Sequence, residues 1–440
     1  MIGGLTKTTS RLAIATAFAA FASTGVMAAD LGGNCCSDLE ERVAELEATT
    51  ARKGNRRVSL EVSGHVHEGI MIWDDGYDSG SYIGTPNYSR TRFRFKGSAQ
   101  INTDWSAGFL IEIGLRQTGN TSGWDQFDNG HNQGGMDIRH QALYVKSKRL
   151  GTVWLGHTSM AVDGISDICL GCPISSTHES QLGWGGFETR FNGTALGLGA
   201  QAVGPSWSDL GAGNMVASNG ARRQLLRYIS PELAGFVFSA DWGGYEDADS
   251  PDNWTVALRY ANEFNGVRVA GGIGYHNTND ALDTVDYEGW GGSASIQHTA
   301  TGLFVAGSYG EQTDNNIVGV GEEDTTDGWS VIAGLGRKFS PMGATTFWVR
   351  YGEYTGRNFG FGDDGADTDP VVQLWNGASD VLSLGINQKI DAAAMEVYVS
   401  YYHVTGDVTA TNAALQGVAV GDKYDSADFD AVLFGARIRF

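Results

Sequence analysis

The C-terminal end of the chain, residues 429–440, alternates between two rows of side chains with a period of two residues. Successive side chains of a β-strand point to opposite faces, so each row lies on one face of a strand. One row is apolar and ends at Phe440, whereas the other ends in Arg437 and Arg439. Such a strand separates a nonpolar environment from water. The last strand of a soluble β-sandwich has the same pattern, so the rest of the chain must decide between the two.

The period-two pattern continues through most of the chain from Val58 onward. It predicts about 16 or 17 strands, one of them hidden within 187–221, and many have about 9–11 residues, the length that crosses a bilayer at a tilt. Short gaps alternate with long polar gaps, as periplasmic turns alternate with external loops in a membrane barrel. The sequence therefore predicts an all-β fold, a transmembrane antiparallel β-barrel of about 16 strands. Four tryptophans near strand ends would form an interfacial girdle: Trp242, Trp254, Trp290 and Trp329.

The first 29 residues have the features of a secretory signal peptide: Lys7 and Arg11, a short apolar segment at 12–21, and small residues before the expected cleavage site. Residues 30–56 follow as a periplasmic helical segment and basic hinge, and residues 57–440 as the barrel. Apolar residues spaced 4, 3, 4 from Leu39 onward predict a short coiled coil. A short amphipathic helix on the barrel rim is the alternative.

Composition supports an exported barrel and excludes other classes. The net charge of −21 argues against nucleic acid as a partner. The chain has 63 glycines and only 7 prolines, which suits many strands joined by tight turns rather than disordered linkers. Four cysteines are too few for a disulfide scaffold. After the signal peptide no uncharged apolar run is long enough for a spanning helix, so a membrane-spanning mature chain would have to be a closed barrel.

The arginines of the predicted strands fall on the polar row rather than on the apolar row. An arginine that faced lipid at the midplane would cost about 2–4 kcal/mol, so this parity places the arginines in the lumen. Scattered charge on a soluble sheet would look the same without the barrel. Three of these arginines share one face of the second strand, namely Arg90, Arg92 and Arg94, and Arg259, Arg268 and Arg350 occupy the polar rows of later strands.

Three segments resemble one protein family. Residues 30–60 are similar to the N-terminus of alphaproteobacterial general porins, and Arg227-Tyr-Ile-Ser-Pro231 with its following Gly-Phe resembles a segment of trimeric porins. Gly151–His157 resembles the strand that precedes their pore-constricting loop, although most relatives have Arg near the position of His157. The resemblance implies a homotrimer of 16-stranded barrels, each with a water-filled channel that its third external loop narrows. It also implies that the terminal aromatic Phe440 is recognised by the barrel-assembly machinery.

The resemblance places the constriction loop at residues 157–190. Its acids are Asp163, Asp167 and Glu179. Asp163 and Asp167 are expected to face a cationic wall across the lumen, formed by Arg90, Arg92 and Arg94 with the last two central; the alternative is that the acids hydrogen-bond the backbone of their own loop. A transverse field between the two charged walls would select solutes by charge and polarity. Cys169 and Cys172 lie in this loop and are expected to form a disulfide in an oxidising compartment. A catalytic redox pair would need a thioredoxin-like context, which this sequence lacks.

The function expected from the sequence is an outer-membrane porin for passive diffusion of small hydrophilic solutes and ions, without enzymatic activity. A substrate-specific channel and a structural tether are the alternatives. No cofactor or metal is expected: His65 and His67 suit polar lining better than a metal site. The acidic external loops, such as 363–369, either bind Ca²⁺ loosely or are solvated. Outer-membrane lipid and lipopolysaccharide are further expected partners.

Overall fold

The computed structural model describes residues 57–86, 88–116, 126, 135–176, 186–191, 202–212, 222–244, 252–279, 286–315, 324–361, 373–411 and 418–440. The predicted signal peptide, the helical segment 30–56, Glu179 and the acidic run 363–369 lie outside these residues. No helix in the described ranges is long and apolar enough to cross a membrane.

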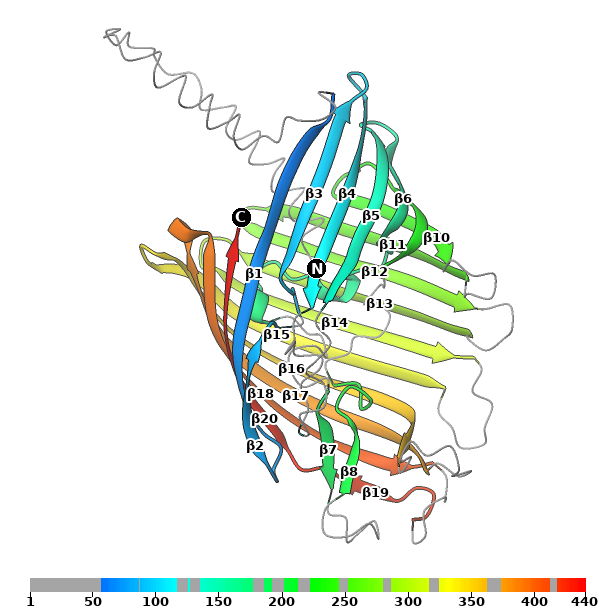
Figure 1. Cartoon of the computed structure of the whole chain (residues 1–440), viewed down its shortest axis with the longest axis vertical. Coiled ribbons are helices and arrows are strands. Elements are labelled where there is room, and N and C mark those ends of the chain that lie inside the picture. The colour runs from blue at the N-terminus through cyan, green and yellow to red at the C-terminus, as the bar shows by residue number, and fades with distance from the viewer. Residues whose placement is uncertain are drawn as a thin grey trace.

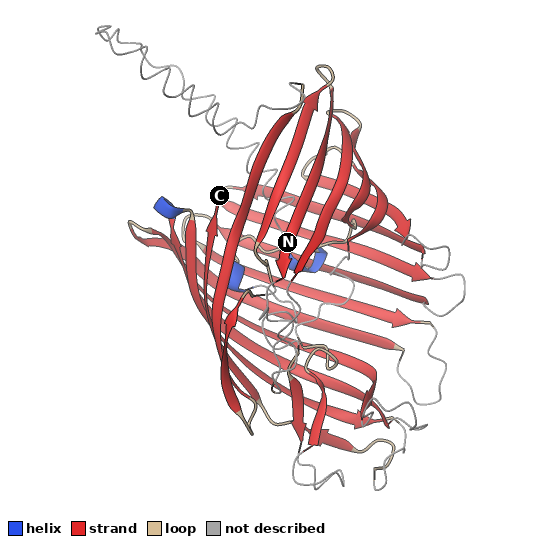
Figure 2. Cartoon of the chain, in the orientation of Figure 1, coloured by secondary structure: helices blue, strands red, loops and turns tan. Residues whose placement is uncertain are grey.

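The described strands form one closed antiparallel barrel (Figures 1 and 2). The main sheet has 18 strands, and it closes because β1 pairs with β20, from His65 opposite Arg439 to Asp74 opposite Asp430. Two of the 18 are short extensions: β2 pairs with β1 beyond the end of β3, and β19 pairs with β18 beyond the end of β20. Without β2 and β19, 16 strands surround the lumen, which confirms the predicted architecture.

The barrel strands, in chain order, are β1 Ser59–Asp74, β3 Arg92–Gln100, β4 Trp105–Arg116, β5 Gly135–Ser147, β6 Gly151–Ser159, β9 Arg222–Ile229, β10 Phe236–Gly244, β11 Asp252–Phe264, β12 Val267–Asn279, β13 Asp286–His298, β14 Leu303–Asp314, β15 Thr325–Ser340, β16 Gly343–Phe361, β17 Gln373–Ile390, β18 Met395–Ala410 and β20 Phe429–Arg439. The remaining elements are β2 Ser79–Gly84, β7 Glu188–Phe191, β8 Ala202–Ser206, β19 Lys423–Asp425 and the 3₁₀ turns η2 Ile165–Asp167, η3 Ile174–Ser176 and η4 Asp391–Ala393.

Tight turns join neighbouring strands at the end of the barrel that carries the C-terminus. Asn265 and Gly266 connect β11 to β12, whose flanking residues Phe264 and Val267 are paired, and both turn residues have positive φ angles of 49° and 80°. Two consecutive positive φ angles define a type I′ turn, which matches the twist of a hairpin and favours the Asn-Gly sequence found here. The local sequence therefore favours this hairpin.

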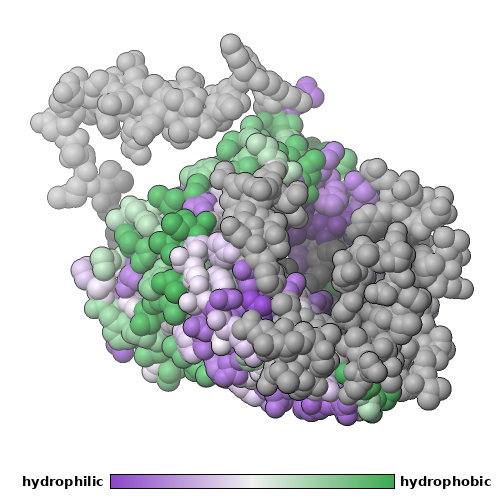
Figure 3. Space-filling model, turned by 60° about the horizontal axis from the view of Figure 1, so that its bottom comes forward, coloured by the Kyte–Doolittle hydropathy of each residue, from purple (hydrophilic) through white to green (hydrophobic). Residues whose placement is uncertain are grey.

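The barrel has an apolar outer surface and a polar inner surface. Outward rows carry exposed apolar side chains, such as Val305, Val331 and Val349, whereas inward positions carry buried polar ones such as Ser293 and Ser295. Figure 3 shows the apolar residues over the outer wall and hydrophilic residues around the opening. A soluble sandwich would bury its apolar rows instead, so this arrangement requires a nonpolar environment outside the barrel.

Outward aromatic side chains pair across strands near one end of the barrel. Trp254 lies 5.2 Å from Tyr275, and Trp290 lies 5.1 Å from Tyr309, measured between ring centroids. All four side chains belong to neighbouring strands from β11 to β14. Aromatic rings of this kind prefer the level of the lipid head groups, so the aromatic band marks one boundary of the apolar surface.

The wall of the barrel is uneven in height. Strands β15 to β18 have between 16 and 19 residues, while β3, β6, β9 and β10 have only 8 or 9. The tall strands are therefore longer than the 9–11 residues that the sequence predicts for many strands. The expectation of a barrel strand within 187–221 was wrong, because β7 and β8 pair only with each other in a separate two-stranded sheet.

Candidate pore constriction

The connection between β6 and β9 folds into the barrel rather than away from it. Its η2 turn packs against the inner faces of β12, β13 and β14, where Ile165 is fully buried. Serines of β13 hold this part of the loop: the N–H of Ile168 donates to Ser293 Oγ at 2.9 Å, and the N–H of Leu170 donates to Ser295 Oγ at 3.0 Å. Ser293 in turn donates to the Ile165 carbonyl at 2.6 Å. Small hydroxyl side chains on the wall thus satisfy the backbone of the inserted loop.

The start of the loop is fixed to the wall by an arginine and a carboxylate. Arg259 of β11 donates to the carbonyl of Ala161 at 2.7 Å and to the carbonyl of Asp163 at 2.8 Å. The buried carboxylate of Asp241 on β10 accepts the N–H of Ala161 and the hydroxyl of Thr255. Arg259, predicted as a lumen charge, therefore anchors the loop.

The end of the described loop is tied down by a disulfide and by a second set of wall contacts. Cys169 and Cys172 are bonded to each other. Beyond them the η3 turn packs against β17 and β18, and Trp348 of β16 donates its indole N–H to Ser175 Oγ at 3.1 Å. Between residues 160 and 176 the loop is thus attached to strands from β10 to β18, which fixes its path inside the barrel.

A cluster of arginines around one carboxylate lines the wall at β3, β4 and β5. Glu112 of β4 is completely buried and accepts from Arg92 at 3.2 Å, from Arg94 Nε at 2.7 Å and from Arg139 at 2.8 Å. The side chain of Arg94 is 41% exposed, whereas those of Arg92 and Arg139 are only 4% and 7% exposed. Arg94 is therefore the member of this cluster that presents its charge to solvent, while Arg90 pairs with Asp137 at 3.0 Å.

A second cluster of the same kind lies on the other side of β1. Glu396 of β18 accepts from Arg437 Nε at 2.7 Å and from Arg439 at 2.7 Å. Between the two clusters, His65 contacts the carbonyl of Arg90 at 2.9 Å, and His67 contacts the hydroxyl of Tyr398 at 2.8 Å. The imidazoles are thus part of the hydrogen-bonded wall, with these ring nitrogens already occupied.

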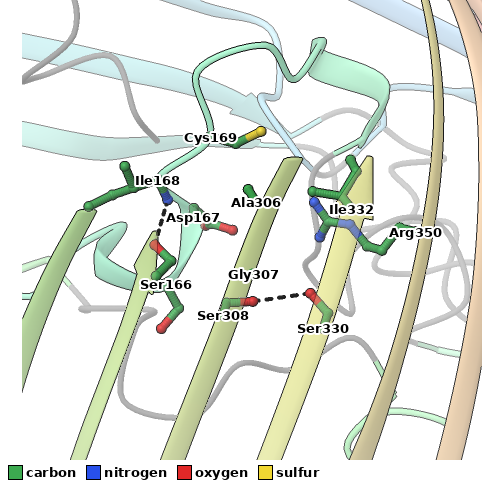
Figure 4. A pocket seen from close by; sticks show the side chains of 11 residues that line it. Ser166, Asp167, Ile168, Cys169, Ala306, Gly307, Ser308, Ser330, Ile332 and Arg350 are labelled. Atoms are coloured by element: carbon green, nitrogen blue, oxygen red, sulfur yellow. Dashed lines mark hydrogen bonds between the residues drawn. The ribbon is translucent and has the colours of Figure 1, made fainter. Parts of the chain in front are cut away.

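The loop acids and the first arginine cluster lie on opposite sides of the lumen. Strand β3 is followed around the barrel by eight strands up to β13, which is half of the 16-strand circumference. Because η2 sits on β12 to β14, Asp167 lies on the wall opposite Arg94. Asp167 also shares a small cavity of about 10 Å³ with Arg350 of β16 (Figure 4), which is room for about one water. Asp163 lies nearer the start of the loop, where the charges of Arg222 and Arg227 on β9 act on its carboxylate.

Parity alone missed several members of this site. Arg139 was not identified, because a β-bulge between Glu112 and Ile113 shifts the register of β5 and turns Arg139 inward beside His140. Glu112 occupies the polar row of β4, so the same parity argument could have found it.

The structure also places His157 in the outward row of β6 together with Leu155, so the inserted loop begins after Ser159. Arg268 donates to Gln297 on the neighbouring strand at 3.0 Å.

A further inserted segment, which we call the inner hairpin, comprises residues 186–191 and 202–212. Trp207 and Leu210 are fully buried, and Trp207 packs near Phe429 of β20 with ring centroids 6.4 Å apart. Arg190 forms a buried ion pair with Asp75 at 2.7 Å, and Ser379 donates to the Leu210 carbonyl at 2.9 Å. In Figure 1 the hairpin lies at the end of the barrel away from the C-terminus.

Replacing Gly356 with leucine should displace the inner hairpin. A Cβ atom at Gly356 would stand 1.7 Å from the carbonyl oxygen of Asp209, so a side chain cannot fit while the hairpin stays in place. We expect a higher single-channel conductance from the displaced hairpin, measured in a planar bilayer. The matched control is Gly135→Leu at the start of β5: a Cβ atom there meets nothing within 4 Å, and the residue does not have a positive φ. An unchanged conductance in Gly356→Leu would show that the hairpin does not limit ion flow.

Comparison with known proteins agrees with this architecture. The anion-selective porin from Comamonas acidovorans has a similar fold with a TM-score of 0.53 and 16% identity, covering 87% of this chain and all of that one. OmpT, an outer membrane protein of Vibrio cholerae, gives a TM-score of 0.51 and 15% identity over 88% of this chain and 99% of its own. The outer membrane channel DcaP of Acinetobacter baumannii gives 0.50 and 13% over 89% and 100%.

These identities establish the fold alone, and no curated protein sequence matches the chain. The family is shown by sequence: the model of Gram-negative porins matches residues 12–428, nearly the whole chain. A closed barrel with an apolar exterior, a polar interior and an inserted loop is what that family requires. The chain therefore belongs to the Gram-negative porin family and forms a channel in the outer membrane.

Proposed function

We propose that the channel lets small hydrophilic solutes and ions diffuse passively, with a preference for anions at its constriction, and that it has no catalytic activity and no cofactor. The observation that carries this proposal is the excess of arginine over acid on the inner wall. Glu112 alone faces three arginines, and Glu396 alone faces two. A ring of cationic side chains at a narrow point favours anions.

The net charge of the whole chain, −21, would favour cations if it acted on the pore. Charge that lies more than about 10 Å from the ion path is largely screened at 0.1 M salt, however. The wall charges next to Arg94 therefore count more than those of the external loops. We propose that the anion preference is weak, because loop acids such as Asp167 lie on the opposite wall of the same constriction.

The test is single-channel recording of the detergent-purified protein in a planar bilayer with a salt gradient. Ohmic steps would support an open diffusion pore, and the sign of the reversal potential would report the favoured ion. Well-folded protein without conductance would contradict the proposal. A reversal potential of the cation-selective sign would refute the proposed role of the arginine wall while leaving the pore itself intact.

Neutralising Asp163 and Asp167 together should increase the preference for anions. Both acids lie in the inserted loop: Asp167 lies on the wall opposite Arg94, and Asp163 lies near Arg222 and Arg227, so Asp163→Asn with Asp167→Asn leaves the lumen arginines with less compensation. We expect a reversal potential shifted toward the anion limit in the salt-gradient recording. Asp391→Asn, in the exposed η4 turn between β17 and β18, is the control that removes a carboxylate far from the loop. Unchanged reversal potentials would show that neither acid affects ion selectivity at the constriction.

We also propose that the protein is a homotrimer and a member of the alphaproteobacterial branch of the family. The sequence resemblance supports both, and one of the similar OmpT structures is described as a trimer. Phe440 is exposed at the end of β20, where its backbone bonds Gly64 in both directions, so its side chain is accessible to the assembly machinery. Acids beside outward aromatics, such as the half-buried Asp380 next to Tyr351, are suited to contact lipopolysaccharide through divalent cations.

A further inference from the structure

Three polar side chains form a row on the outside of the barrel, where apolar side chains are expected. Gln141 of β5 pairs in register with His157 of β6, and His157 pairs with Gln224 of β9. All three belong to outward rows, because their neighbours two residues away, Leu143, Leu155 and Leu226, are about half exposed. Gln141 and Gln224 are themselves exposed, and His157 is half-buried. No hydrogen bond holds their side-chain amides or imidazole within the described part of the chain. We call this row the amide patch.

The amide patch lies at the depth of the hydrocarbon. On β5, exposed apolar residues flank it on both sides: Leu143 toward the β5–β6 turn and Ile138 and Met136 toward the other end. A polar group without a partner in the hydrocarbon region costs several kcal/mol by general estimates, which is why such groups in membrane proteins face protein or water. The patch is therefore unsuited to contact lipid.

Strand β1 carries one further polar side chain on its outer face. Glu68 is exposed in the row of Val66, Ile70 and Ile72, which are all exposed apolar residues. The hydroxyl of Thr85 donates to Glu68 Oε1 at 2.9 Å, which leaves the second carboxylate oxygen available as an acceptor. Glu68 thus presents an acceptor at membrane depth, four strands around the barrel from His157.

We propose that Glu68 of one protomer accepts hydrogen bonds from the amide patch of the next protomer, and that these two sites form the subunit interface. A closed ring of identical subunits uses heterologous contacts, so each subunit needs two different, complementary faces. A carboxylate on β1 and amide and imidazole donors on β5, β6 and β9 meet this requirement. The same side of the barrel holds its shortest strands, with 8 or 9 residues in β3, β6 and β9, and a neighbouring subunit can cover a wall of low height.

This inference rests on the proposed homotrimer. It predicts a change in the dissociation temperature of the trimer opposite to the change expected if Glu68 faced lipid. Because the buried hydroxyl of Thr85 donates to Glu68, Glu68→Leu is combined with Thr85→Val. If Glu68 faced lipid, this double change would leave the assembly as heat-stable as before or make it more stable, because apolar side chains suit that surface. At a subunit interface, the same change removes the acceptor, and the trimer should dissociate at a lower temperature. Glu68→Gln keeps an acceptor and should largely restore the wild-type dissociation temperature. Ile70→Leu, in the same outward row, is the matched control and should change nothing.

Cross-linking the full-length protein provides the second measurement. In a background with Cys35→Ser and Cys36→Ser, the pair Glu68→Cys and His157→Cys should form covalent dimers and trimers on oxidation, seen after heating without reductant. Glu68→Cys combined with Ile273→Cys is the control, because Ile273 is exposed on β12, well away from the proposed interface. Cross-linked species in the first pair alone would support the interface.

Monomer bands from both pairs, or an increased heat stability of Glu68→Leu with Thr85→Val, would overturn the proposed interface. The same preparations are recorded in planar bilayers, which separates the two proposals. Conducting protein that does not cross-link contradicts the interface and leaves the diffusion pore standing. Cross-linked protein that does not conduct contradicts the diffusion pore and leaves the interface standing.

Discussion

Glu112→Gln should make the channel distinctly more selective for anions. The substitution removes the carboxylate charge that pairs with Arg92, Arg94 and Arg139, while the amide keeps a similar shape. A unit charge at about 4 Å in water contributes about 1 kcal/mol, and Glu112 is completely buried, so we expect a change in the anion-to-cation permeability ratio of at most roughly fivefold. The measurement is the reversal potential in a salt gradient, compared with the wild-type channel.

The same substitution should weaken the barrel wall. Removing one partner of a buried ion pair costs about 3–5 kcal/mol, because the remaining charge stays buried without compensation. We therefore expect the barrel to unfold at a lower temperature. The measurement is the difference in gel mobility between heated and unheated protein. Glu353→Gln is the matched control: Glu353 is exposed on β16 and interacts with Tyr351 and Trp329 rather than with an arginine of the lumen. An unchanged reversal potential in Glu112→Gln would mean that permeating ions do not sense the cluster.

Arg259→Ala should release the start of the inserted loop and raise the conductance. Arg259 donates to the carbonyls of Ala161 and Asp163, and each hydrogen bond from a charged group contributes about 1.5–3 kcal/mol. With both lost, residues 160–163 should move away from the wall, which we expect to appear as a larger and noisier single-channel current. Ion selectivity should also change, because Asp163 belongs to the released segment.

The matched control for this variant is Arg268→Ala. Arg268 lies on the neighbouring strand β12 and hydrogen-bonds Gln297, a wall residue outside the inserted loop. The control removes one lumen arginine without freeing the loop, so its current should stay quiet. A quiet, unchanged current in Arg259→Ala would show that the contacts of Ser293 and Ser295 hold the loop without help.

The sequence by itself determined the class of fold. A chain that alternates apolar and polar residues over many segments, with turn residues such as Asn265 and Gly266 between them, forms hairpins of neighbouring strands. These contacts are local in sequence, and the apolar rows require a nonpolar surrounding. The parity that placed Arg92, Arg94 and Arg259 inside follows from the same physics, because a charged side chain is costly in lipid.

Only the tertiary structure decided what these side chains do inside the barrel. The bulge at Glu112 determined that Arg139 joins the cluster, and the inward path of the loop made Arg259, a lumen charge by its parity, an anchor of that loop. Parity reports a face of a strand, whereas each of these roles depends on a partner far along the chain. The loop contacts Ser293 from 125 residues away. Such long-range contacts depend on closure of the whole barrel. The local alternation of residues therefore does not predict which long-range contacts form.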